Sequence, residues 1–362
     1  MMKRAYNFNA GPSALPYEVL EKAQQELVNF KDTGMSLMEL SHRSKEYDQV
    51  HEKALLYLRE IYQIPEDYEV LFLQGGASLQ FAMIPLNFLA SDKVGNYILT
   101  GAWSEKALKE AQKIGNSVSI LSSKDTNYNF IPKSSELRPT ENAAYVHLTS
   151  NNTIYGTQWH DFPELQSDIP LIADMSSDIL SKEIDISKFA MIYAGAQKNL
   201  GPAGVTVAII KKDMLANIPA TIPTILNYQT HAKSNSLYNT PPTYSIYILS
   251  LVLEWVKNQG GLKVIEKRNA EKAGVLYNCI DQSNGFYTPH AQSDSRSHMN
   301  ITFTLPSEEL TKKFIAESKE QGFVGLAGHR SVGGCRASIY NAVPYESCEA
   351  LVNFMEKFRI NN

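Results

Sequence analysis

Apolar segments alternate with amphipathic segments from residue 69 to residue 210. Seven short apolar segments are expected to be strands: 69–74, 96–101, 117–121, 143–150, 170–174, 190–194 and 204–210. Between them, 78–89 and 103–114 have the apolar spacing of helices. Strands that are apolar on both faces and alternate with helices indicate a mostly parallel sheet covered by helices. The pattern therefore predicts an α/β fold with a seven-stranded sheet.

The two ends of the chain carry other patterns. Four helices are expected outside the sheet: Pro16 to about Phe30, 45–62, 244–258 and 262–280. The segment 218–243 is rich in Pro, Thr and Asn and is expected to be a long functional loop. The rest of the chain alternates strands and helices as a compact α+β unit. We expect an N-terminal segment packed on the small domain, a large domain and a small C-terminal domain, with the bounds 1–15, 16–258 and 259–362.

Composition restricts the class of protein. The chain has 362 residues, 43% of them hydrophobic and 20% charged, which suits a globular protein of about two domains. The net charge of −4 and the lack of a basic block argue against nucleic acid as a partner. No apolar run approaches the ~20 residues of a membrane helix, and no apolar signal segment follows the basic start. A cytoplasmic soluble enzyme without membrane contact is the expectation.

The three cysteines, Cys279, Cys335 and Cys348, are odd in number and form no CxxC pair. They are expected to be free thiols in a reducing compartment. Neither a disulfide framework nor a metal site is expected.

Lys198 lies in the polar turn between the last two expected strands, GAQKNLGPAG. A lysine held at a strand end beside apolar surface has a depressed pKa, and its neutral amine can attack an aldehyde. An exposed loop lysine is the commoner case, so Lys198 alone decides nothing. Asp174 ends the neighbouring apolar strand, 24 positions earlier. A lysine and a carboxylate at the carboxyl ends of neighbouring strands suit pyridoxal 5′-phosphate (PLP), whose aldehyde and ring nitrogen need such partners.

Two further strand ends carry candidate residues. GGAS follows strand 69–74 and opens a helix, where free N–H groups can bind a phosphate, although a tight strand–helix turn explains the same residues. Trp103 opens the helix after strand 96–101, and its indole either packs in the core or covers one face of a flat ring. Together with Lys198 and Asp174, these positions favour the ring-binding interpretation.

The chain resembles the phosphoserine aminotransferase family, fold-type I PLP enzymes of the class-V aminotransferase group. The resemblance covers nearly the whole chain and rests on stretches in one order: NFNAGPSALP, ELSHRSKEY, QGGASLQF, SNNTIYGTQW, ADMSSDILS, YAGAQKNLGPAG and GHRSVGGCRASIYNA. It implies the fold-type I transferase architecture, with a large cofactor-binding domain and a smaller C-terminal α+β domain. It also implies a homodimer whose active sites are shared between subunits.

The resemblance implies a role for each cofactor residue. Lys198 would form the Schiff base, Asp174 would hold the pyridinium nitrogen, and Trp103 would stack on the ring. Thr153 would donate toward the ring hydroxyl. The cofactor phosphate would be bound by Ala77, Ser78 and Gln197 and, from the partner subunit, by Asn239 and Thr240.

The resemblance also implies a basic substrate pocket: His42, Arg43, His329, Arg330 and Arg336. A guanidinium fork grips a carboxylate, and two His-Arg pairs suit a phosphate, whereas a lone arginine is more often a surface ion pair. Both pairs are expected to fold onto one site. The implied reaction is reversible transamination between L-glutamate and 3-phosphohydroxypyruvate in L-serine biosynthesis. A second implied acceptor is 3-hydroxy-2-oxo-4-phosphooxybutanoate, in pyridoxine biosynthesis.

Two alternatives stay open. The first is a sister enzyme of the same fold, such as an alanine–glyoxylate or serine–glyoxylate aminotransferase or a cysteine desulfurase. The His-Arg pairs argue against the other aminotransferases, and Cys335, inside an expected strand, is a poor desulfurase nucleophile. The second is a catalytically silent α/β binding protein, which would not need the lysine.

Overall fold

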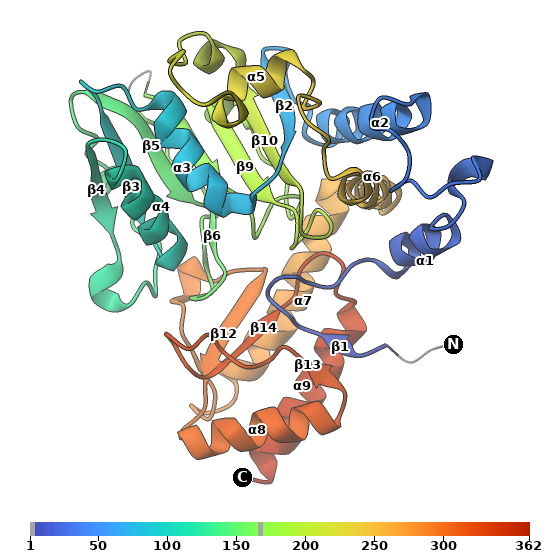
Figure 1. Ribbon diagram of the computed structural model, residues 1–362. Helices are drawn as coiled ribbons and strands as arrows, with labels where there is room; N and C mark the ends of the chain where they lie inside the picture. Colours follow the sequence, from blue (N-terminus) through green and yellow to red (C-terminus); the bar gives the residue numbers. More distant parts are fainter. Residues whose placement is uncertain (1–3, 166–168) are drawn as a thin grey trace.

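A seven-stranded sheet forms the centre of the larger part of the molecule (Figure 1). The computed structural model describes residues 4–165 and 169–362. The strand order is β2-β10-β9-β8-β5-β3-β4. Only β10 runs antiparallel to its neighbours in this sheet, so the expected mostly parallel sheet is confirmed. The strands span Tyr68–Leu73 (β2), Val94–Leu99 (β3), Ser117–Ser122 (β4), Ala143–Thr149 (β5), Leu171–Asp174 (β8), Met191–Gly195 (β9) and Thr206–Lys211 (β10).

Helices cover both faces of this sheet because successive strand residues point to opposite sides and nearly all are apolar. In β9, Ile192 and Ala194 pack with one buried cluster, and Met191 and Tyr193 pack with another. The first cluster includes residues of α2 (Lys45–Tyr62) and α6 (Thr243–Asn258). The second includes residues of α3 (Gly76–Phe88) and α4 (Ala102–Gln112).

The smaller part of the molecule is built on a three-stranded antiparallel sheet in the order β11-β12-β14. Strand β1, Tyr6–Asn7, pairs in parallel with β13, so this N-terminal segment lies along the smaller part. Aromatic side chains, among them Phe8, Phe303 and Phe314, fill its core. Its elements are β1 (Tyr6–Asn7), α7 (Leu262–Asp281), β11 (Thr288–Pro289), β12 (Asn300–Thr304), α8 (Glu308–Glu320), β13 (Phe323–Val324), β14 (Cys335–Ser338) and α9 (Tyr345–Ile360).

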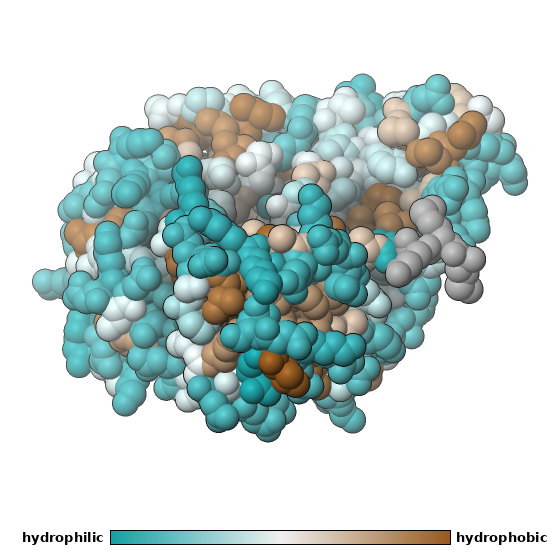
Figure 2. All heavy atoms as spheres, turned by 90° about the horizontal axis from the view of Figure 1, so that it is seen from below, coloured by the Kyte–Doolittle hydropathy of each residue, from teal (hydrophilic) through white to brown (hydrophobic). Residues whose placement is uncertain are grey.

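Seen from the side of α8 and α9, the surface is mostly hydrophilic, with apolar residues in small separate groups (Figure 2). Such scattered apolar residues are normal for a water-exposed surface. Within residues 4–165 and 169–362, no helix combines the length and apolar character needed to cross a bilayer.

Two expected elements differ from the structure. The first helix, α1, spans Tyr17–Gln25 and ends before Phe30, and Lys31 and Asp32 beyond it adopt positive φ angles of 46° and 60°. The segment 218–243 is not wholly irregular, since Asn227 caps the short helix α5 (Tyr228–Lys233) by accepting a hydrogen bond from the Gln229 amide at 2.8 Å. The remaining short elements are the hairpin strands β6 (Asn151–Asn152) and β7 (Thr157–Gln158) and 3₁₀ turns at Phe30–Asp32, Lys124–Thr126, Ser134–Glu136, Ile186–Lys188, Lys212–Leu215, Thr224–Leu226 and Ser293–Ser295.

Candidate active site

Lys198 follows β9 in the turn that leads to β10, and its side chain is buried. Its Nζ donates a hydrogen bond to Thr153 Oγ1 at 2.6 Å. Burial lowers the pKa of Lys198 to about 8, against the opposing effect of the Asp174 carboxylate. A substantial fraction of the amine is therefore neutral near physiological pH, as the sequence predicted.

Asp174 is the last residue of β8 and is 4% exposed. One of its oxygens accepts hydrogen bonds from the backbone amide and the hydroxyl of Ser176, at 2.9 and 2.6 Å. Burial raises the pKa of Asp174, while the hydrogen bonds from Ser176 and the charge of Lys198 act in the opposite direction. The site thus places an oriented carboxylate and a partly neutral lysine in one buried region.

A cavity of about 290 Å³ joins these two groups. It is lined by seven of the predicted cofactor residues: Ala77, Ser78, Trp103, Thr153, Asp174, Gln197 and Lys198. Two predicted substrate residues, His329 and Arg336, line it as well. The structure therefore brings nine predicted residues from seven separate stretches of the chain to one place. Ser176 and Asn151 also line the cavity, and no spacing in the sequence pointed to them.

The N-terminus of α3 opens onto this cavity through Gly76, Ala77 and Ser78. Gly75 caps the helix with φ 84° and has no side chain to bond the free N–H groups of the first turn. A side chain at Gly75 would also place its Cβ 2.6 Å from Leu79 Cβ. The first turn is thus left with backbone donors for an anion such as a phosphate.

Arg336 extends from β14 of the smaller part to the cavity. Its Nη1 donates to the Thr153 carbonyl at 3.1 Å, and its buried Nε has no partner. None of the ion pairs formed by the described residues includes it. Burial lowers the pKa of Arg336, yet a guanidinium stays charged at any physiological pH. A partly buried cation that forms no ion pair with the described residues and lines a cavity is suited to an anionic ligand.

Five predicted residues do not line this cavity within one chain: His42, Arg43, Asn239, Thr240 and Arg330. His42 Nδ1 lies 3.3 Å from Thr240 Oγ1, so that residues from before α2 and before α6 form a separate, largely exposed group. Gln74, just before α3, donates to the Thr240 carbonyl at 3.3 Å. The expectation that both His-Arg pairs fold onto one site is therefore not met inside a single chain.

Neither the cysteines nor any metal-binding group of the described residues offers an alternative reactive site. Cys335 is fully buried, and burial raises the pKa of its thiol to about 12, which leaves no thiolate for desulfurase chemistry. The three cysteines are free thiols. Among the described residues, no group of three or more His, Cys, Asp or Glu side chains can hold a metal ion.

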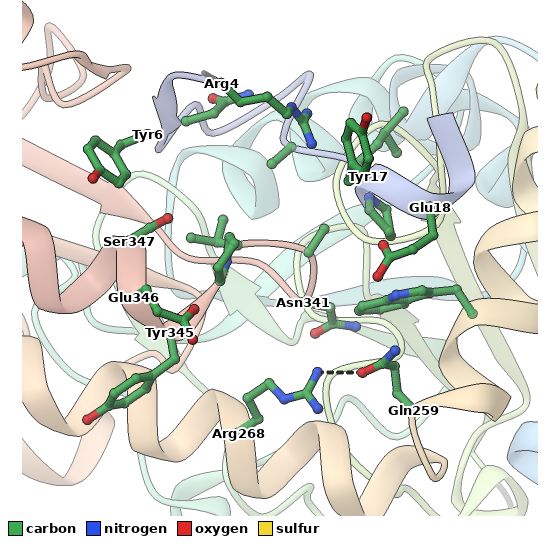
Figure 3. A pocket seen from close by; sticks show the side chains of 18 of the residues that line it. Arg4, Tyr6, Tyr17, Glu18, Gln259, Arg268, Asn341, Tyr345, Glu346 and Ser347 are labelled. Carbon is green, nitrogen blue, oxygen red and sulfur yellow. Dashed lines mark hydrogen bonds between the residues drawn. The ribbon is translucent and has the colours of Figure 1, made fainter. Parts of the chain in front are cut away.

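A larger cavity of about 740 Å³ lies between the N-terminal segment, the α6–α7 junction and the start of α9 (Figure 3). Arg268, which points into it, is already bonded to the Gln259 side chain at 2.9 Å. Among the described residues, no buried lysine or carboxylate lines this larger cavity. Size therefore does not identify the site here, and the smaller cavity has the reactive groups.

Comparison with known proteins agrees with this geometry. The family model for class-V aminotransferases matches residues 5–351. The chain belongs to the class-V aminotransferase family. It is 66% identical to the phosphoserine aminotransferase of Geobacillus kaustophilus, with 99% of each chain covered.

Two solved structures extend this comparison to three dimensions. The phosphoserine aminotransferase of Bacillus circulans subsp. alkalophilus is 56% identical, with 99% of each chain covered and a TM-score of 0.98. The PLP-bound phosphoserine aminotransferase of Trichomonas vaginalis is 39% identical, with 98% of this chain and 100% of that chain covered and a TM-score of 0.93. This class-V aminotransferase is thus an enzyme whose cofactor is PLP, which excludes the silent binding protein. The buried lysine, the carboxylate and the free N–H groups at the start of α3 are the groups that PLP needs.

Proposed function

We propose that this class-V aminotransferase transfers an amino group reversibly between L-glutamate and 3-phosphohydroxypyruvate, which yields 2-oxoglutarate and O-phospho-L-serine. This reaction is a step of L-serine biosynthesis. The observation that carries the proposal is the partly buried Arg336, which lies in the same cavity as Lys198 and Asp174 and has a buried Nε without a partner. The identity of 66% to a phosphoserine aminotransferase over 99% of the chain supports the substrate.

The cofactor would be held by residues at the buried end of the cavity. Lys198 would bind its aldehyde, Asp174 its ring nitrogen, and Thr153 its ring hydroxyl, while Trp103 would cover one ring face. Its phosphate would lie at the start of α3, bound by Ala77, Ser78 and Gln197 and by the partner subunit's Asn239 and the partner subunit's Thr240. When bound, PLP supplies an electron sink for the bond that breaks at the substrate Cα.

Lys198 would act as the general acid–base of the reaction. Its pKa of about 8 lies close to neutral pH, so that Nζ can both take and return a proton. The protonated amine has an acceptor in Thr153 Oγ1, 2.6 Å away, which fixes its position. Lys198 Nζ takes the proton from the substrate Cα and releases it later in the half-reaction.

Arg336 would bind the α-carboxylate that both substrates share. Its free Nε and its second terminal nitrogen can form the two parallel hydrogen bonds of an arginine–carboxylate pair. His329 lies beside it, and the pKa of this histidine is lowered by burial and by the nearby charges of Arg336 and Arg330. We expect His329 and Arg330 to bind the substrate phosphate, or the side-chain carboxylate of glutamate in the other half-reaction. The longer acceptor 3-hydroxy-2-oxo-4-phosphooxybutanoate carries the same two anions and is proposed as a second substrate.

A homodimer would complete the site. His42 lies against Thr240, and Arg43 follows it, so these residues would reach the partner's cavity as one group. Large apolar side chains a few residues from this group in the sequence are exposed: Met38 is 57% exposed and Tyr238 49%. Exposed apolar side chains at one side of a chain are typical of a subunit interface.

Subunit mixing tests the shared site. Lys198→Ala and Arg43→Ala chains, each nearly inactive alone, are co-expressed so that half of the dimers are mixed. If Arg43 serves the partner's cavity, each mixed dimer has one intact site, and the pool regains about a quarter of wild-type activity. If Arg43 serves its own chain, no dimer has an intact site and no activity returns, which would contradict the shared site.

A coupled assay tests the reaction itself. Purified protein is given L-glutamate and 3-phosphohydroxypyruvate, with glyoxylate and pyruvate as competing acceptors. We expect the phosphorylated oxo acid to be strongly preferred, and 3-hydroxy-2-oxo-4-phosphooxybutanoate to be accepted in a separate assay. Preference for glyoxylate would instead support an alanine–glyoxylate or serine–glyoxylate aminotransferase. The cytoplasmic location is proposed on the three free, buried thiols, which suit a reducing compartment.

A further inference from the structure

A row of three buried polar side chains, Asp174, Tyr193 and His147, crosses three neighbouring strands of the sheet. Tyr193 in β9 lies directly opposite Asp174 in β8. Its hydroxyl is close enough to that carboxylate for the charge of Asp174 to raise the pKa of Tyr193. The same hydroxyl lies 2.9 Å from Nε2 of His147, which comes from β5. Three strands of the sheet thus contribute one side chain each to a connected row. Of these three residues, Asp174 alone lines the cavity. Tyr193 and His147 would therefore not touch the cofactor or the substrate.

The row is closed to water along its whole length. Asp174 is 4% exposed, Tyr193 0%, and His147 1%. Burial lowers the pKa of His147 to about 3, so its imidazole is neutral at any working pH. Burial, followed by the charge of Asp174, raises the pKa of Tyr193 well above its ordinary value, so its hydroxyl keeps its proton. Tyr193 therefore has one proton to donate.

The proton positions follow from counting donors and acceptors. If Tyr193 donates its proton to Asp174, its oxygen must accept from His147, and Nε2 then carries the imidazole hydrogen. Nδ1 is left as a bare acceptor, and His147 Nδ1 indeed has no partner. The other tautomer would bury an unpaired N–H group and would turn the Tyr193 proton away from the carboxylate. An unpaired buried donor is rarer than an unpaired acceptor, so the first arrangement is favoured.

We propose that Tyr193 and His147 are positioning residues that orient the Asp174 carboxylate and keep it charged for the cofactor's ring nitrogen. The inference rests on the proposed role of Asp174. Ser176 holds one carboxylate oxygen from the loop side, and Tyr193, opposite Asp174 in the next strand, would provide a further donor from the sheet. His147 fixes the direction in which Tyr193 donates. Hydrogen bonds to the charged form of a carboxylate favour that form, so loss of the row makes Asp174 a weaker partner for a protonated ring nitrogen.

The test compares two substitutions that remove one buried hydroxyl each. Tyr193→Phe deletes the hydroxyl of the row and keeps the ring. Tyr145→Phe is the matched control, because its hydroxyl is equally buried and bonds only the Tyr97 hydroxyl, at 2.9 Å. For each apoprotein we would measure the thermal midpoint and the affinity for PLP, and for each holoenzyme kcat and the KM for 3-phosphohydroxypyruvate.

We expect Tyr193→Phe to weaken PLP binding and to lower kcat by roughly ten-fold each, with KM nearly unchanged, since one hydrogen bond to a charged group is lost. Tyr145→Phe should lower the thermal midpoint by a similar amount and leave PLP affinity and kcat at wild-type values. Equal PLP affinities in Tyr193→Phe and Tyr145→Phe would overturn the inference. Failure of the wild-type protein to bind PLP would instead overturn the proposed function.

Substitutions at His147 provide a second test if Tyr193→Phe does not fold. His147→Gln can still place an N–H group near the Nε2 position, whereas His147→Leu has no donor. Partial recovery of PLP affinity and kcat in His147→Gln relative to His147→Leu supports the row. Equal values in these two variants contradict it, because a purely structural histidine would not depend on the donor.

Discussion

Polar side chains at the buried end of the cavity are hydrogen-bonded within the chain, whereas those at its mouth, Arg336 and Arg330, are left partly or wholly without partners among the described residues. At the buried end, Asp174 accepts from Ser176, Lys198 donates to Thr153, and all four side chains come from one chain. At the mouth, Arg336 has an unpaired Nε, and Arg330 is exposed and lies outside the cavity lining. One chain thus preorganises the cofactor end, while the mouth is left with free cations for an anionic substrate and for the partner's residues.

The largest effect is expected from removing the amine at the buried end. Lys198→Ala should lower turnover on the order of 10⁴-fold, because the proton-transferring group is lost, while PLP still binds without a covalent link. The measurement is the coupled assay together with PLP absorbance after gel filtration. Turnover near the wild-type value in Lys198→Ala would contradict the role of the buried end.

Lys272 is a matched control for the reactive lysine. It is fully buried, and burial lowers its pKa to about 7, yet its Nζ donates to the carbonyls of Ile339, Tyr340 and Val343 at 2.9, 2.8 and 3.1 Å. Borohydride treatment of the PLP-loaded wild-type protein, followed by peptide mass spectrometry, should label Lys198 and leave Lys272 unlabelled. A label on Lys272 would mean that a low pKa alone, without the cavity, selects the lysine.

Removal of Arg336 at the mouth should have the next largest effect. Arg336→Gln should lower kcat/KM roughly 10²- to 10³-fold, because a partly buried charged partner of the substrate carboxylate is lost. The α-carboxylate is common to glutamate and to the oxo acid, so both half-reactions should fall by similar factors in single-turnover experiments. A loss confined to the phosphorylated substrate would place the phosphate, not the carboxylate, at Arg336.

Substitution of Arg330 changes the mouth alone. A smaller effect on kcat/KM is expected, because this side chain is exposed. Arg330→Ala should lower kcat/KM for 3-phosphohydroxypyruvate roughly ten-fold and leave pyruvate nearly unchanged, since only the phosphate loses a partner. Lys109→Ala, which removes another exposed cation, should change neither. Equal losses on phosphorylated and unphosphorylated acceptors would argue against phosphate recognition at the mouth.

The sequence predicted the buried end better than the mouth, for a physical reason. Lys198 and Asp174 each follow an apolar strand, and the carboxyl ends of parallel strands meet at one edge of a sheet, so their meeting could be expected. His42 and Arg43 lie before α2, and nothing in a single sequence says which chain of an assembly they serve. In the structure His42 contacts Thr240, and neither His42 nor Arg43 lines the cavity of its own chain.

The hydrogen-bonded row was not predictable from the sequence either. Tyr193 and His147 stand in strands that are apolar on both faces, so the pattern does not tell which face each side chain occupies. Their spacing to Asp174 also follows no motif, because the three residues come from three strands whose register is set by pairing. The seven strands themselves were predicted, since their apolar runs are long and repeated. The early end of α1 and the short helix α5 were missed, since both depend on local backbone angles and capping.

The smallest predicted effect is a shift in the pH dependence of cofactor capture, and it measures how the two ends influence each other. The rate at which the apoprotein captures PLP covalently requires a neutral Lys198, so it should rise with pH and reach half its maximum near pH 8. Burial sets this lowered pKa; Asp174 and Asp178 raise it, and Arg336 lowers it further. Asp174→Asn should therefore move the midpoint to lower pH, and Arg336→Gln should move it to higher pH. Stopped-flow absorbance between pH 6 and pH 10, at saturating PLP, measures these midpoints. Shifts in the same direction for both variants would show that the mouth and the buried end do not act on Lys198 through their opposite charges.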